Sequence, residues 1–169
     1  MRIEEAIKTA IEYETRIRDI YRDAAKEVSD PSGKQFFKMM GDDEQFHIEY
    51  LMDKLRQWEK TGKLHAEKLE STIPLIEPIR RSTAKIEAHM SKKDLSSEKV
   101  ILSRALKAEV ETSDFYKKMV NELPDHAQKM FARFLEIEEN HIAAVQAELD
   151  YITHTGYWFD FKEFDMEEL

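Results

Sequence analysis

The second half of the chain repeats the first half. Residues 10–21 align without a gap with residues 105–116, and the alignment places Glu14 on Glu109. Residues 37–47 align in the same way with residues 131–141. The two offsets are 95 and 94 residues, so both segments of each half keep their register. We infer that one structural unit has been duplicated.

The composition and the hydrophobic pattern both predict an all-α fold. The chain has 169 residues, 36% charged and 41% hydrophobic, with only four Gly and four Pro, which is typical of long solvated helices. Apolar residues recur at spacings of three and four in four long stretches. The expected helices span residues 3–28, 34 to about 60, 96 to about 120, and 125 to about 153, and Ser96-Ser97-Glu98 resembles a capped helix start.

Short links inside each half and a long middle connection predict a bundle of two helical hairpins. We expect one domain over residues 1–155, with a crossover at about 62–95 that is interrupted by Pro74 and Pro78. Apolar residues of the crossover suggest a short amphipathic piece (Leu75, Ile76, Ile79, Ile86 and Met90). Residues 156–169 form an aromatic tail, and we expect it to pack on the bundle or on a second subunit of a homodimer.

Acidic and imidazole side chains interrupt the apolar stripes at matched positions. Positions three apart share a helix face, so Glu44 with His47, and Glu138 with His141, point two ligand groups at one spot. Ionised carboxylates in a bundle core cost several kcal/mol each unless cations neutralise them. A dimetal site is therefore predicted, and its ligands are Glu14, Glu44, His47, Glu109, Glu138 and His141.

The donor set limits the metal. The chain has no Cys, which excludes disulfides, zinc–thiolate sites and iron–sulfur clusters. Six oxygen and nitrogen ligands suit iron or manganese better than zinc or magnesium, and the sequence does not separate iron from manganese. Tyr21 and Tyr116 each lie seven residues after a glutamate ligand, where a phenol could hydrogen-bond a ligand carboxylate.

A single Glu-x-x-His motif is weak evidence, but two at matched positions of a repeat are much harder to obtain by chance. The other histidines have no such partners, and we assign no metal to His65, His89, His126 or His154. Glutamates near the motifs fall on other helix faces, and we expect them to be exposed: Glu12, Glu111, Glu136 and Glu139.

With these six ligands and two tyrosines, residues 1 to about 155 resemble the rubrerythrin family of the ferritin-like superfamily. The resemblance implies two iron ions bridged by Glu44 and Glu138, with Glu14 and Glu109 as terminal ligands and one histidine on each ion. It also implies a reaction of the reduced irons with hydrogen peroxide or dioxygen. Typical rubrerythrins reduce peroxide to water.

The chain departs from the rubrerythrin pattern in two places, and it also differs from the related bacterioferritin. Typical rubrerythrins carry a four-Cys rubredoxin domain, and this Cys-free chain would need an external donor such as a rubredoxin-like protein. They also have an extra Glu three residues after the third-helix ligand, where this chain has Thr112. Bacterioferritin shares the six ligands, but Gln45 and Phe46 occupy the positions of its haem-binding Met, so we expect no haem.

Three functions remain open from the sequence. The first is a di-iron oxidoreductase that reduces peroxide or dioxygen, and the second is a ferroxidase or iron-binding protein without sustained turnover. The third is an oxygenase that acts on an organic substrate. A net charge of −9 argues against nucleic acid or an anionic membrane as partner. The charged start, without an apolar leader, predicts a cytoplasmic protein.

Overall fold

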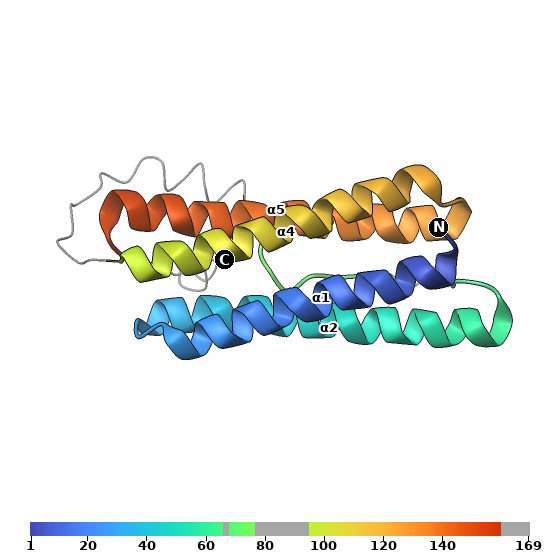
Figure 1. Cartoon of the computed structure of the whole chain (residues 1–169), viewed down its shortest axis with the longest axis horizontal. Coiled ribbons are helices and arrows are strands. Elements are labelled where there is room, and N and C mark those ends of the chain that lie inside the picture. The colour runs from blue at the N-terminus through green and yellow to red at the C-terminus, as the bar shows by residue number, and fades with distance from the viewer. Residues whose placement is uncertain (66–67, 77–94, 160–169) are drawn as a thin grey trace.

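The chain folds into two long helical hairpins that lie side by side (Figure 1). The structure is a computed structural model and describes residues 1–65, 68–76 and 95–159. The first hairpin pairs α1 (Ile3–Glu27) with α2 (Pro31–Thr61), and the second pairs α4 (Ser96–Glu122) with α5 (Asp125–Thr155). The described residues contain these four helices and no strand, so the all-α four-helix expectation is confirmed at that level.

The helix ends follow local chemistry. The side chain of Asp30 accepts hydrogen bonds from the amides of Ser32 and Gly33, so α2 begins at Pro31, three residues before the predicted start. Ser96 is the first residue of α4, and Leu95 precedes it as a cap residue without a side-chain hydrogen bond. The serine-capped start predicted for this helix is therefore wrong, although its position is right.

The duplication seen in the sequence extends to the helix ends. Helices α2 and α5 both have 31 residues, and both stop at a glycine in the left-handed conformation, Gly62 with φ 64° and Gly156 with φ 73°. Two residues later a buried apolar side chain turns back onto the bundle, which is Leu64 in the first half and Trp158 in the second. The same chain reversal thus closes both hairpins.

A polar layer divides the hydrophobic core into two clusters. On one side lie the start of α2 and the end of α5, with residues such as Phe37 and Val145. On the other side lie the end of α2 and the start of α5, with residues such as Leu51 and Phe131. The metal-ligand candidates occupy the layer between the clusters on all four helices, and apolar side chains therefore keep water away from both of its faces.

The crossover begins with a described stretch that runs along the bundle (Figure 1). It is held by polar side chains: buried Lys54 donates to the carbonyl of His65, and Arg133 donates to the carbonyl of Leu69. Asn140 donates to the carbonyl of Pro74 and accepts from the amide of Ile76. Of the amphipathic piece predicted in the crossover, Leu75 and Ile76 are described, and Ile79, Ile86 and Met90 lie outside the described residues.

The aromatic tail is described up to Phe159. Trp158 is buried, and its ring lies 5.3 Å from that of Phe37 and 6.1 Å from that of Phe36. Phe161 and Phe164 lie outside the described residues, and the predicted homodimer stays a prediction. None of the described helices has the length and apolar run that a membrane span requires.

The contact between Trp158 and α2 leads to a stability prediction. A Cβ atom on Gly33 would lie 2.7 Å from Cε2 of Trp158, so Gly33→Ala forces the indole out of place and should lower the free energy of unfolding by about 1–3 kcal/mol. Gly41→Ala is the matched control, because its Cβ would lie 3.4 Å from the nearest atom, an ordinary contact. Urea unfolding followed by circular dichroism measures both. Equal stability of the two variants would contradict this packing.

Candidate metal centre

The structure brings the six predicted ligand residues together in the middle of the bundle. Glu14 comes from α1, Glu44 and His47 from α2, Glu109 from α4, and Glu138 and His141 from α5. All six side chains are 0% exposed. They are inward-facing because each lies on the apolar stripe of its own helix, as the three-and-four spacing required. This convergence of six residues from four helices is the central feature of the site.

Ligand atoms of these residues form two overlapping groups, each with its atoms within 4.8 Å of one another. One group is Glu14, Glu44, His47 and Glu138, and the other is Glu44, Glu109, Glu138 and His141. Each group contains one histidine and one glutamate that the other group lacks. Glu44 and Glu138 belong to both groups. The geometry therefore contains two adjacent four-residue sites that share two carboxylates.

Many atoms in this layer have no hydrogen-bond partner among the described residues. They include both carboxylate oxygens of Glu44 and Glu138, one oxygen each of Glu14 and Glu109, both ring nitrogens of His47, and Nδ1 of His141. Nδ1 of His141 lies 2.8 Å from Oε1 of Glu44, an ion pair within this layer. Buried polar atoms without partners are costly, and cations would satisfy all of these atoms at once. The donor set therefore fits a metal centre.

The two tyrosines connect the hairpins. The hydroxyl of Tyr21, on α1, donates a hydrogen bond to Glu109 on α4, and the hydroxyl of Tyr116, on α4, donates to Glu14 on α1. Each phenol thus binds the glutamate of the other hairpin, not the one that precedes it on its own helix. Each bond leaves the second oxygen of its glutamate without a hydrogen-bond partner.

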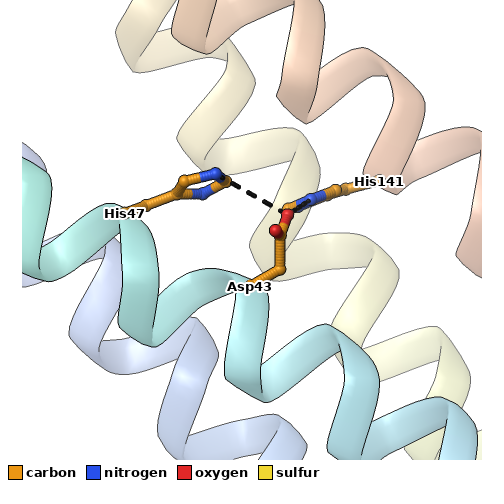
Figure 2. Close-up of side chains that lie close together, drawn as sticks. All are labelled: Asp43, His47 and His141. Carbon is orange, nitrogen blue, oxygen red and sulfur yellow. Dashed lines mark hydrogen bonds and ion pairs between the residues drawn. The ribbon is translucent and has the colours of Figure 1, made fainter. Parts of the chain in front are cut away.

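Asp43 is a buried member of the site that sequence analysis missed. It lies between the two imidazole rings (Figure 2), with Oδ2 at 2.8 Å from Nε2 of His141 and 3.6 Å from Nε2 of His47. In the sequence, only the position of Asp43 one helical turn before His47 indicated that it could contact the site, because the repeat has no matching acidic residue. The residue that corresponds to Asp43 in the second half is the apolar Ile137.

Asp43, His47 and His141 also form a group that could hold an ion by distance alone. The oxygens of Asp43, however, already accept hydrogen bonds from Ser71 Oγ at 2.7 Å, from the Thr72 amide at 2.8 Å and from Thr72 Oγ1 at 3.0 Å. Asp43 therefore acts as an orienting carboxylate. Its hydrogen bond holds the Nε2 side of His141, and its charge lies 3.6 Å from Nε2 of His47, while both Nδ1 atoms lie toward the glutamates.

Protons supply the missing positive charge in the metal-free site. Burial raises the pKa of Glu44 to about 7, helped by the charge of Glu14, and burial likewise raises the pKa of Glu138 well above its usual value. Burial alone would lower the pKa of His47, but the carboxylates of Glu14 and Glu44 raise it to about 10. The pKa of His141 rises well above normal because nearby carboxylates outweigh burial. Four groups therefore hold protons more tightly than in water.

Of the residues that were assigned no metal, none that the structure describes belongs to the buried ligand groups. His65, His126 and His154 are exposed, and His89 lies outside the described residues. Glu12, Glu136 and Glu139 are exposed as expected. Glu111 is half-buried and pairs with Arg16 at 3.1 Å, so its predicted exposure is only partly right.

The crossed tyrosine bonds predict equal penalties for two substitutions. Tyr21→Phe and Tyr116→Phe each leave a buried glutamate oxygen without its donor, and each should lower the free energy of unfolding by about 1–3 kcal/mol. Tyr13→Phe is the matched control, because Tyr13 is only partly buried and its ring stacks on Phe115. Denaturant unfolding of the three variants measures the effect. A loss with Tyr13→Phe as large as with the other two would refute the assignment.

The raised pKa values predict that the metal-free protein becomes less stable as the pH rises. The stabilising proton on Glu44 is lost from about pH 4.5 through pH 7, and the one on His47 from about pH 6.5 through pH 10. We expect the unfolding temperature of the metal-free chain to fall steadily between pH 5 and pH 10. Glu44→Gln should flatten the part of this fall below pH 7. Calorimetry across this range provides the measurement, and a rising unfolding temperature would contradict it.

Comparison with protein-family models, curated proteins and solved structures gives no match for this chain. The family resemblance therefore depends on the ligand residues and the tyrosines alone. What the geometry establishes is a four-helix chain whose buried Asp, Glu and His side chains could hold metal ions.

Proposed function

We propose that the chain is a rubrerythrin-like, ferritin-like di-iron oxidoreductase that reduces hydrogen peroxide or dioxygen with electrons from an external donor. The observation that carries this proposal is the pair of overlapping ligand groups that share Glu44 and Glu138. Two adjacent sites with common carboxylates suit two ions held close together. Donation by oxygen and imidazole nitrogen alone suits iron, with manganese as the alternative.

The residues have distinct roles in this proposal. Glu44 and Glu138, which belong to both ligand groups, would help hold both ions, while Glu14 with His47, and Glu109 with His141, would complete one site each. Tyr21 and Tyr116 fix the two terminal glutamates, and Asp43 fixes the imidazole of His141 and places a negative charge beside that of His47. Bound ferrous ions would supply the two electrons that, together with two protons, convert one hydrogen peroxide molecule to two waters. The apolar clusters on both sides of the layer keep bulk water away.

The closed burial of the layer favours a small oxidant. All six ligand side chains are 0% exposed, so a bulky organic substrate would reach them only after the helices separate. Peroxide and dioxygen have the size of one or two water molecules and need no such opening. This supports reduction of a small oxidant over oxygenation of an organic substrate.

One observation favours the alternative, a ferroxidase or iron-binding protein without sustained turnover. Rubrerythrins have a seventh ligand residue, an extra glutamate on the third helix, and here that position is Thr112. The hydroxyl of Thr112 donates to the carbonyl of Ala108 on its own helix, so it is not free to follow a metal ion. A centre limited to six ligands is consistent with one oxidation per loading.

Metal content and peroxide titration test the proposal. The anaerobically reconstituted chain should bind two ferrous ions, and one equivalent of hydrogen peroxide should oxidise both rapidly. Repeated turnover with a chemical reductant and a small rubredoxin-type carrier would support the oxidoreductase. A single oxidation without turnover would favour the alternative. Absence of iron binding would overturn both.

A pair of neighbouring glutamates provides the matched variants. Glu138→Ala removes a carboxylate shared by both ligand groups and should reduce the bound iron from two ions to one or none. Glu139→Ala removes an exposed neighbour and should leave two ions bound. Iron per chain is measured by elemental analysis after desalting. Full occupancy in the Glu138 variant would contradict the shared role.

A further inference from the structure

The crossover reaches into the outer shell of the candidate metal centre. Ser71 and Thr72 lie 28 and 29 residues after Asp43, and together they supply three of the hydrogen bonds that its carboxylate accepts. Asp43 is 0% exposed although Thr72 itself is exposed. A surface segment therefore determines how a fully buried carboxylate is held.

The consequences reach both histidines. The Oδ2 atom that accepts from Ser71 is also the atom nearest Nε2 of His141 and Nε2 of His47. The second half of the chain has Ile137 at the equivalent position, so this one carboxylate hydrogen-bonds His141 and forms an ion pair with His47. A change in the position of Asp43 would therefore turn the Nδ1 atom of His141 relative to the glutamates and change the electrostatic environment of His47.

The hydrogen bonds between the crossover and Asp43 are specific. Ser71 Oγ donates to Oδ2, the Thr72 amide and hydroxyl both donate to Oδ1, and Ser71 Oγ in turn accepts from the Ile73 amide at 3.2 Å. Hydrogen bonds to a charged acceptor are stronger than neutral ones. Both carboxylate oxygens of Asp43 thus accept hydrogen bonds from the crossover, in addition to their contacts with the histidines.

We propose that Ser71 and Thr72 are positioning residues of the metal centre, which act through Asp43 on His47 and His141. Docking of the crossover and binding of metal are then linked: each favours the other by the same free energy. This inference rests on the metal binding proposed above and extends it to a segment that contains none of the six ligand residues.

Cobalt binding to the metal-free full-length chain tests the inference. The double variant Ser71→Ala/Thr72→Val removes both hydroxyl donors and should weaken Co²⁺ binding about 10- to 100-fold, the usual effect of losing outer-shell partners. Thr72→Ser keeps its hydroxyl and should bind within about threefold of the wild type. A shifted visible spectrum of bound Co²⁺ in the double variant would report altered histidine geometry.

Arg133→Ala is the matched control. Arg133 also ties the crossover to the bundle, through the carbonyl of Leu69 at 3.0 Å, but it makes no contact with Asp43. This variant should keep wild-type Co²⁺ affinity and spectrum. Equal weakening in Arg133→Ala and in the double variant would mean that the crossover acts only through general stability, which would overturn the inference.

Hydrogen exchange measures whether metal binding in turn stabilises the docked crossover. The Thr72 amide should exchange more slowly when Co²⁺ is bound, by a factor that the double variant reduces. Normal Co²⁺ affinity in the double variant would overturn this inference and leave the metal centre standing. Absence of Co²⁺ and Fe²⁺ binding in the wild type would overturn the proposed function and the linkage together.

Discussion

The structure depends on how positive charge is supplied to a buried layer of four glutamates. A carboxylate away from water costs several kcal/mol unless it is neutralised, and this layer lies between two apolar clusters. In the metal-free chain, raised pKa values keep protons on Glu44, Glu138, His47 and His141. Two divalent cations would bring the same four positive charges, and they would also satisfy the unpartnered oxygen and nitrogen atoms.

Duplication provides the ligands in matched pairs, and the fold crosses some of their contacts between the halves. Tyr21 bonds Glu109 and Tyr116 bonds Glu14, so the two hairpins are joined at the terminal ligand of each site. Because of this crossing, the site forms only when the two hairpins pack together. A single hairpin would have neither the shared carboxylates nor the hydrogen bonds that hold the terminal ones.

The site is less symmetric than the repeat. Only the first half provides an orienting carboxylate, Asp43, and only the first hairpin is followed by a crossover whose Ser71 and Thr72 hold it. The paired positions seven residues after the histidines also diverge, since Lys54 holds the crossover and Glu148 accepts from the amide of Phe159. The two halves thus share the same ligand residues, but the contacts that surround the ligands differ between them.

The sequence by itself determined the helices, the inward stripe and the six buried ligand candidates, because helical spacing puts residues three and four apart on one face. It also placed both tyrosines near the layer. Only the tertiary structure decided which glutamate each tyrosine binds and that Asp43 lies between the two histidines. Those contacts join residues 88 to 102 positions apart, or a helix to a distant loop, and depend on how the hairpins pack. Local periodicity carries no information about such pairings.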